Sequence, residues 1–199
     1  MSRERAATER RAVERIVLGA YATLTGRRNE PLRYAMMDDT PVGLLGLALG
    51  PRGLRHVNFS RSEDAFVERL LAEHGDVPVL RSDALDPARR ALERYFAGRR
   101  LDFDLAVDLG DLPAFHRRVL DATTRIPAGA VATYTEVARR AGSPRASRAA
   151  GNALHDNPVA IVVPCHRVLR ADGSLGGYGG GLPIKEWLLQ HEGARPAAL

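Results

Sequence analysis

The change of hydrophobic pattern near Pro113 limits the folds that are open to the chain. Between Leu32 and Ser60, short apolar runs alternate with turn signals, which indicates an antiparallel meander. After Pro113, apolar residues recur at helical spacing. We therefore expect an α+β protein. The predicted parts are an N-terminal helical extension (1–30), an α/β domain (31–111) and a C-terminal domain (112–195).

Turn and cap residues place the elements of the first domain. Ser62 or Asp64 is suited to cap a helix over 63–74 that carries the apolar residues Phe66, Leu70 and Leu71. Asp86 and Pro87 supply the cap and the first-turn proline of a second helix. The strands of the meander are expected at 32–37, 42–50 and 54–60, and two further strand candidates are 77–80 and 101–109.

The C-terminal domain contains a helix-turn-helix pattern. Thr133 and Glu136 form a capping-box signature for a short helix that ends at Gly142. Ser143 is expected to cap the next helix, which continues to about His155. Further helices are expected over 113–124 and from Pro183 onward, and the β-branched run 159–163 is expected to be a buried strand.

Positive charge is concentrated in the C-terminal part. Residues 113–199 carry 11 basic and 6 acidic side chains, whereas residues 1–112 carry 18 of each. This excess favours a polyanionic partner such as DNA, although a merely solvated surface accounts for the charge alone equally well.

Composition excludes several other classes of protein. One cysteine cannot form an internal disulfide or a cysteine-rich zinc site. No apolar run approaches the length of a membrane span, and the N-terminus lacks the apolar core of a secretory signal. We expect a cytoplasmic protein with no membrane partner.

Cys165 is the residue best suited to chemistry. It follows the predicted strand and Pro164, and His166 stands next to it. A thiolate is a nucleophile, and titratable neighbours are unusual for a cysteine that only fills a core, which is the competing interpretation. Adjacent residues of an extended chain point to opposite faces, which favours a water relay between thiol and imidazole. Glu192 is a candidate to orient the His166 imidazole. A cysteine protease is less favoured, because its cysteine and histidine are usually distant in the sequence, whereas Cys165 and His166 are adjacent.

Cofactor chemistry is not predicted. The glycine-rich run 173–181 matches neither nucleotide-binding loop. It better fits a backbone that approaches a flat ligand closely, with a flexible loop as the alternative. The six histidines form no metal-binding motif, so no metal site is predicted either.

The order of short motifs within 126–193 resembles that of the O6-alkylguanine-DNA alkyltransferases, or methylated-DNA–protein-cysteine methyltransferases. The resemblance rests on PCHRV (164–168), NP (157–158), YGGG (178–181), KEWLL (185–189) and HEG (191–193). YFAG (95–98) and FDLAVDL (103–109) are similar to the end of the family's first domain. The resemblance implies a ribonuclease-H-like α/β domain, followed by a winged-helix-like domain whose helix-turn-helix binds double-stranded DNA.

The resemblance also implies the reaction. A monomer without cofactor would repair DNA by moving an alkyl group from O6-alkylguanine, or O4-alkylthymine, irreversibly to Cys165 after flipping the base out of the duplex. His166 would be the base, acting through water and held by Glu192. Asn157 would tie the recognition helix to the active-site segment. Tyr134 would give a proton to the guanine ring.

Contacts to DNA and to the base are implied in the same way. Arg148 would fill the gap left in the base stack, and Tyr134, Thr135 and Ser143 would contact phosphates. The substrate pocket would consist of Cys165, Val168, Tyr178, Gly179 and Gly180. Outside this motif context, Tyr134 would be a core aromatic, Arg148 a surface charge and Asn157 a helix stop.

The sequence also departs from the family pattern. Gly179 stands where many relatives carry serine, which removes a hydroxyl contact to the alkylated oxygen. The residues PAFH (113–116) stand where the family commonly shows a PFQ-like sequence. Two rival functions stay open at this point. A non-catalytic damage-binding protein would lack the reactive cysteine, and a helix-turn-helix regulator would not need PCHRV and would usually dimerise.

Overall fold

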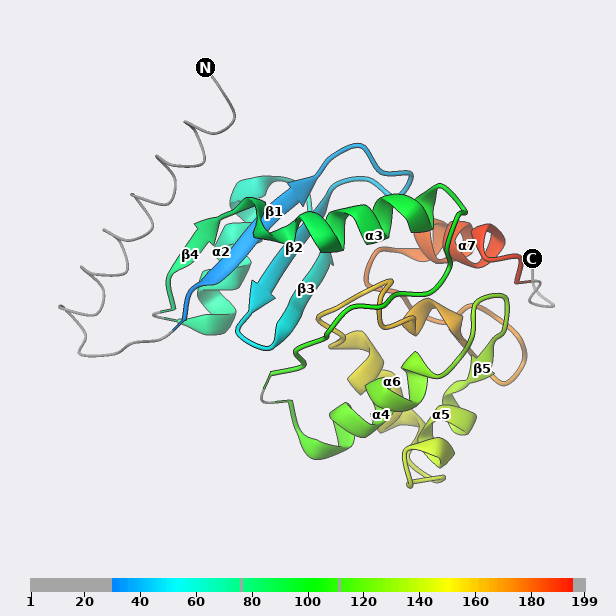
Figure 1. Cartoon of the computed structure of the whole chain (residues 1–199). Coiled ribbons are helices and arrows are strands. Elements are labelled where there is room, and N and C mark those ends of the chain that lie inside the picture. Colours follow the sequence, from blue (N-terminus) through cyan, green and yellow to red (C-terminus); the bar gives the residue numbers. More distant parts are fainter. Residues whose placement is uncertain (1–29, 76, 111, 195–199) are drawn as a thin grey trace, which may run out of the picture.

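The first part of the chain is built on a mixed four-stranded sheet. The computed structural model describes residues 30–75, 77–110 and 112–194, so all but the last residue of the predicted N-terminal helical extension (1–30) lies outside the described residues. The strands lie in the order β3-β2-β1-β4, and β4 pairs with β1 in parallel (Figure 1). Their bounds are β1 Leu32–Met37, β2 Leu45–Gly50, β3 Gly53–Phe59 and β4 Val79–Arg81. The predicted antiparallel meander of β1, β2 and β3 is confirmed.

Helix α2 (Glu63–His74) covers one face of this sheet. Phe66 and Leu70 pack against Ala48 of β2. Leu71, the third apolar residue named for this helix, does not share that face and is 47% exposed. One residue along a helix turns the side chain by about 100°, which carries Leu71 away from the sheet.

The starts of the two helices of this part differ from each other. Ser62 caps α2 through its side chain, as predicted. Helix α3 (Asp86–Phe96) has Leu85 at its N-cap, so the predicted cap by Asp86 is wrong. The reason is a preceding 3₁₀ turn, η1 (Asp83–Leu85), which leads directly into α3 and makes Asp86 its first helical residue.

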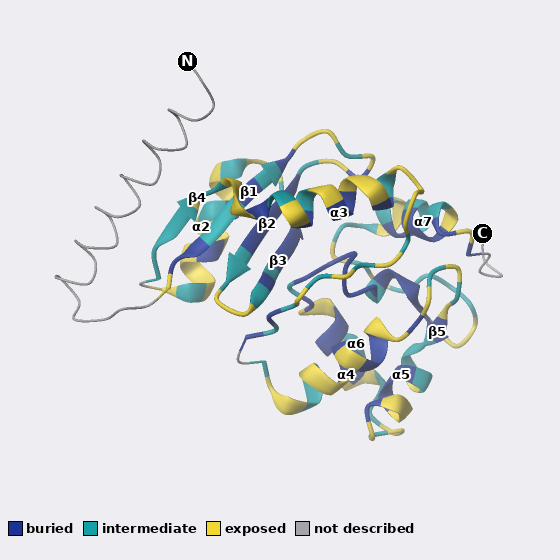
Figure 2. Cartoon of the chain, viewed as in Figure 1, coloured by how far each residue is buried: buried dark blue, intermediate teal, exposed yellow. Residues whose placement is uncertain are grey.

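The main core is continuous from the first part of the chain into the second. Leu92 and Tyr95 of α3 share it with Leu47 of β2, on the sheet face opposite α2, because Leu47 and Ala48 are consecutive in the strand. The same cluster includes apolar residues of the helices that follow, among them Leu120. Buried residues accordingly line the inner sides of both parts (Figure 2).

The strand expected at 101–109 is not formed, although its side chains alternate between partly buried and exposed as far as Val107. The segment makes a single bridge, between Leu54 and Val107. The Asp108 side chain accepts from the N–H of Gly110 over 2.9 Å and from Arg55. These side-chain contacts end the pairing with β3 after one residue.

The second part consists of helices around a short parallel pair of strands (Figure 1). Its helices are α4 (Ala114–Thr124), α5 (Tyr134–Arg140), α6 (Ser147–His155) and α7 (Leu182–His191). The strands β5 (Ala132–Thr133) and β6 (Val168–Leu169) were not predicted. No helix among the described residues is long and apolar enough to cross a membrane.

The helix-turn-helix of α5 and α6 has a longer connection than the sequence indicates. Thr133 and Glu136 form both hydrogen bonds of the predicted capping box. Ser143 does not cap α6, which begins four residues later at Ser147. The Ser143 carbonyl instead closes a turn by accepting from the N–H of Ala146 over 2.9 Å. The prediction that Ser143 lies at a helix start is therefore wrong.

The apolar run 159–163 is buried but is not a strand. Val159 makes one bridge to Val57 of β3, and Ala160 and Val163 bridge each other around a tight turn. Ile161 lies in this turn with φ of 72°, a conformation that is costly for a β-branched residue. The run is apolar because it packs in the main core against the first part of the chain, and the turn delivers the next residues to one point.

Candidate active site around Cys165

A short 3₁₀ helix presents the thiol. Cys165 is the first residue of η2 (Cys165–Arg167), directly after the turn at Ile161. Its N–H donates to the carbonyl of Val163 over 2.8 Å, which fixes the backbone. The side chain is partly buried in the wall of a cavity of about 550 Å³. A volume of this size is ordinary for a small-molecule site.

The cavity lies between the helix-turn-helix and the glycine-rich loop. Six of the predicted site residues line it: Tyr134, Thr135, Arg148, Cys165, Tyr178 and Gly179. Arg148 and Thr135 are exposed, whereas Tyr134 is partly buried. Ser143, Val168 and Gly180 are not among its lining residues. Gly180 packs against the Phe59 ring, which leaves no room for a side chain there.

Two residues of the predicted substrate pocket, Cys165 and Val168, have backbone carbonyls that already accept hydrogen bonds within the protein. The carbonyl of Cys165 accepts from the N–H of Val168. The carbonyl of Val168 accepts from Lys185 Nζ over 2.6 Å. A carbonyl has two lone pairs, so each keeps capacity for a second donor.

Asn157 joins the end of α6 to the thiol. Its Nδ2 donates to the carbonyl of Val163 over 2.9 Å and to Cys165 Sγ over 3.2 Å. Its Oδ1 accepts from the N–H of Val159 over 3.0 Å. The side chain therefore spans the buried turn, in the position that the sequence analysis predicts for it.

His166 is completely buried behind the thiol and is oriented by Glu192. His166 Nε2 lies 2.9 Å from Glu192 Oε1. A carboxylate oxygen accepts, so Nε2 carries the proton and Nδ1 of the neutral ring is a bare acceptor. Nδ1 has no hydrogen-bond partner among the described residues. The predicted His166–Glu192 pair is thus present, and no direct bond joins His166 to Cys165.

Two further residues hold Glu192, and sequence reasoning missed both. Arg167 donates through Nε to Oε2 over 2.7 Å and through Nη2 to Oε1 over 2.8 Å. The Tyr95 hydroxyl, from α3, donates to Oε1 over 2.7 Å. Arg167 and Tyr95 belong to the motifs PCHRV and YFAG, but no spacing rule connects residues so far apart in the sequence.

Lys185 is a second buried cation that the sequence did not indicate. Its side chain is 0% exposed, and Nζ donates to the carbonyls of Val168 and Leu175. Burial lowers the pKa of Lys185 to about 8. The side chain fastens the glycine-rich loop to the segment that follows Cys165.

Burial controls the protonation states of the site. Burial raises the pKa of the Cys165 thiol, against the opposing effects of Asn157 and Lys185. Burial lowers the pKa of His166, so its ring is neutral at pH 7. Burial also works to raise the pKa of Glu192, but the hydrogen bonds from His166 and Arg167 outweigh it and bring that pKa to about 2. The resting site therefore holds a thiol, a neutral imidazole and a carboxylate.

The class that this fold and site define is a helix-turn-helix protein with a cysteine thiol at the wall of a ligand-sized cavity. Comparison with known proteins makes the class specific. Residues 114–194 match the model of the 6-O-methylguanine DNA methyltransferase DNA binding domain, and residues 32–109 match that of the ribonuclease-like domain of the same family.

Individual relatives agree with the two family models. A methylated-DNA–protein-cysteine methyltransferase of Methanosarcina acetivorans is 40% identical over 161 residues, which cover 81% of this chain and 99% of the relative. One of Mycobacterium bovis is 47% identical over 160 residues, covering 80% and 92%. The crystal structure of the Mycobacterium tuberculosis O6-methylguanine methyltransferase superposes with a TM-score of 0.69 at 36% identity, covering 83% of this chain and 96% of that one. The chain belongs to the 6-O-methylguanine DNA methyltransferase family.

Proposed function

We propose that this protein repairs double-stranded DNA by transferring an alkyl group from O6-alkylguanine to Cys165, once per molecule. O4-alkylthymine, which carries the alkyl group on a comparable exocyclic oxygen, is proposed as a second substrate. The observation that carries the proposal is the placement of the Cys165 thiol, at a cavity beside the helix-turn-helix and in front of the His166–Glu192 pair.

The first step of the proposed reaction activates the thiol. Because burial raises the pKa of Cys165, the thiol must give up its proton to react. The bare Nδ1 of His166 takes that proton through a water molecule, and Glu192 stabilises the imidazolium that forms. Asn157 donates to the sulfur and so favours the thiolate.

Alkyl transfer itself is a single displacement. The sulfur forms a bond to the alkyl carbon while the bond from that carbon to the guanine oxygen breaks. The guanine gains one proton from a side chain, that side chain regains a proton from solvent, and His166 releases to solvent the proton that it took from the thiol, so the overall transfer balances. Tyr134 is the proposed donor, since burial and the nearby Cys165 raise the pKa of its hydroxyl and keep it protonated. The products are a thioether and unmodified guanine.

The approach of DNA is proposed from the rim of the cavity. The duplex lies along α5 and α6, and the damaged base leaves the stack to reach Cys165. Arg148 is exposed on α6 at this rim, which suits a side chain that fills the vacated position. Thr135 is exposed at the start of α5 and suits a phosphate contact. A Mycobacterium tuberculosis relative at 36% identity has been crystallised in complex with DNA.

Other parts of the proposal concern the protein as a whole. It acts as a monomer in the cytoplasm, with an α/β domain at 31–111 and a catalytic domain at 112–195.

A purely damage-binding role is less well supported, because such a protein has no use for the buried His166–Glu192 pair behind a thiol. Intact mass measured after incubation with an O6-methylguanine duplex tests the choice. A gain of one methylene on Cys165 is expected, and an unchanged mass alongside DNA binding would favour the binding role.

A further inference from the structure

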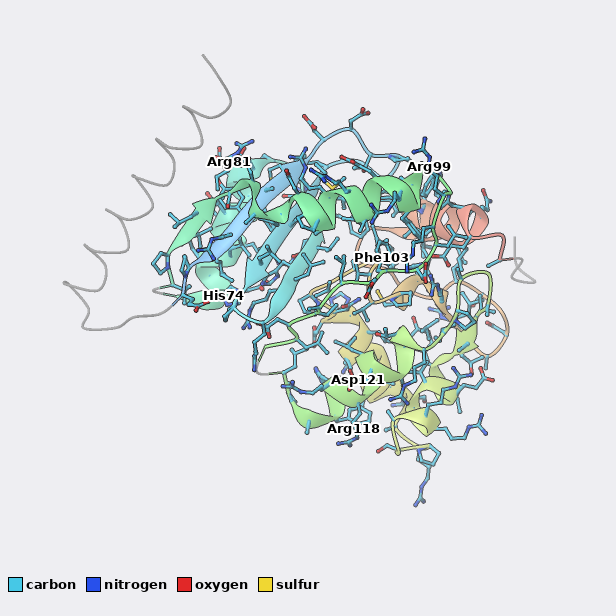
Figure 3. The ribbon with its side chains drawn as sticks, viewed as in Figure 1. His74, Arg81, Arg99, Phe103, Arg118 and Asp121 are labelled. Carbon is cyan, nitrogen blue, oxygen red and sulfur yellow. The ribbon has the colours of Figure 1, made fainter. Side chains whose placement is uncertain are left out.

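Two histidines and a glutamate meet on the far side of β3 from the alkyl-transfer chemistry. His56 lies in β3, and Glu73 and His74 form the last turn of α2. One ligand atom from each of the three side chains lies within 4.8 Å of the others. His56 Nε2 and His74 Nε2 are 2.7 Å apart, and Glu73 Oε2 is 3.8 Å from His56 Nδ1. His74 lies at one end of the sheet, close to the surface (Figure 3).

We propose that His56, Glu73 and His74 bind a divalent transition metal, with Zn²⁺ the best match to two imidazoles and one carboxylate. The proposal is independent of the proposed function, because none of the three residues lines the cavity at Cys165. It adds a site that the sequence analysis does not predict, since His56 and His74 stand 18 residues apart in no recognised motif.

The orientation of His56 suits a metal ligand. Its Nδ1 lies 3.2 Å from Asn58 Oδ1, an acceptor, so Nδ1 carries the proton and the Nε2 lone pair is free to coordinate. Metal-binding histidines characteristically donate their second nitrogen to a carbonyl or carboxylate oxygen in this way.

Metal binding requires a tautomer change at His74, a small separation of the two rings and a shift of Glu73, whose Oε2 lies 3.8 Å from Nδ1 of His56. His56 Nε2 is bare, so His74 Nε2 carries the proton between the two rings when no metal is bound. On coordination His74 carries its proton on Nδ1 instead, and both Nε2 lone pairs face the cation. Zn–N distances of about 2.0–2.1 Å in a tetrahedral site separate two nitrogens by about 3.3 Å. The rings therefore move apart by a few tenths of an ångström.

The carboxylate and its surroundings complete the site. Arg69 binds Glu73 Oε1 over 2.7 Å, which leaves Oε2 available to a metal. The side chain of Glu73 is 38% exposed, so a cation and a water ligand have access from solvent. The C-terminal end of α2 favours a positive charge. The positive charge of Arg55, on β3, disfavours a cation at this place, and the negative charge of Asp108 offsets the effect of Arg55 near His74.

Metal binding by tag-free, full-length protein tests the proposal. The Cys165→Ala variant serves as the parent, so that the thiol contributes no ligand. Isothermal titration with Zn²⁺ and the visible absorption of bound Co²⁺ report affinity and geometry. We expect one equivalent of metal, and a loss of affinity of at least about tenfold in His74→Ala and in Glu73→Gln. Glu73→Gln changes an exposed side chain and so keeps the fold.

His116→Ala is the matched control, because His116 lies apart on α4 next to Asp156. It should bind metal as the parent does. At one fixed Zn²⁺ concentration, an increase in melting temperature is expected for the parent and the control, and a smaller increase for both ligand variants. The proposal is overturned if the parent binds no Zn²⁺ at millimolar concentration, or if His74→Ala and Glu73→Gln bind it as tightly as the parent.

Discussion

The hydroxyl of Tyr95 donates to Glu192 Oε1 over 2.7 Å, although 97 residues separate the two in the sequence. Tyr95 belongs to α3 and is completely buried. Phe103, on the segment that connects the two parts, stacks nearby, with ring centroids 5.2 Å apart (Figure 3). The first part of the chain thus contributes directly to the carboxylate that holds His166, and its role extends beyond that of a separate scaffold.

Removing this hydroxyl should destabilise the whole protein. Tyr95→Phe keeps the ring but removes a buried hydrogen bond to a charged acceptor, which costs about 2 kcal/mol of unfolding free energy. Urea denaturation measures the loss. Tyr34→Phe is the matched control, because Tyr34 makes a similar 2.8 Å bond to Glu63 in a more exposed place. Its loss should stay below about 1 kcal/mol. Equal losses of unfolding free energy in Tyr95→Phe and Tyr34→Phe would contradict a special contribution of the Tyr95–Glu192 hydrogen bond.

Glu192 should matter for alkyl transfer far more than for DNA binding. Glu192→Gln removes the negative charge that stabilises protonated His166 and leaves the buried Arg167 without its partner. We expect transfer from O6-methylguanine duplex to slow by at least about 100-fold, with duplex affinity nearly unchanged. The measurement uses folded protein at low temperature, because breaking a buried ion pair also costs about 3–5 kcal/mol. Glu186→Gln on α7 is the control and should react at the normal rate.

Acid should destabilise the protein through the same carboxyl group. The pKa of Glu192 is about 2 in the folded protein, below its ordinary value of 4.5. A depressed folded pKa stabilises the protein fully above about pH 4.5, and this stabilisation is lost as the pH falls toward 2. The component is on the order of 3 kcal/mol. Unfolding free energies measured between about pH 3 and 6 should therefore fall more steeply with acid for the parent than for Glu192→Gln. Parallel curves would be evidence against the low pKa.

Arg148 should be needed only when a base must leave a duplex. Arg148→Ala is expected to slow repair of O6-methylguanine duplex by at least about tenfold and to leave reaction with free O6-benzylguanine unchanged. Arg145→Ala, just before α6, is a control of the same charge. Equal slowing on both substrates would rule out a role in filling the base stack.

Local sequence signals predict most elements of this fold. The predictions fail where contacts between residues far apart in the sequence determine the local structure. The Thr133–Glu136 box and the three strands of the meander depend on neighbours in sequence and were predicted correctly. The run 159–163 has the composition of a strand, but it folds into a turn because it packs in the core shared with the first part of the chain. A five-residue apolar run does not reveal that context.

The candidate site divides in the same way. Asn157, His166 and Glu192 were found from motifs, and in the structure Asn157 contacts Cys165 while His166 contacts Glu192. Tyr95, Arg167 and Lys185 were missed as parts of the site, because their contacts span 97, 25 and 17 residues. A buried cation or phenol is recognisable only from its partner, and the fold supplies the partner.

The number of bases repaired per protein molecule tests the central claim most directly. The thioether formed on Cys165 is neither hydrolysable nor reducible, and the chain has no second cysteine to accept the alkyl group. With excess O6-methylguanine duplex, repaired guanine should stop at one per active molecule. Cys165→Ala should bind the duplex and repair none. Repair that continues past one equivalent, or any transfer by Cys165→Ala, would contradict a single-use alkyl acceptor.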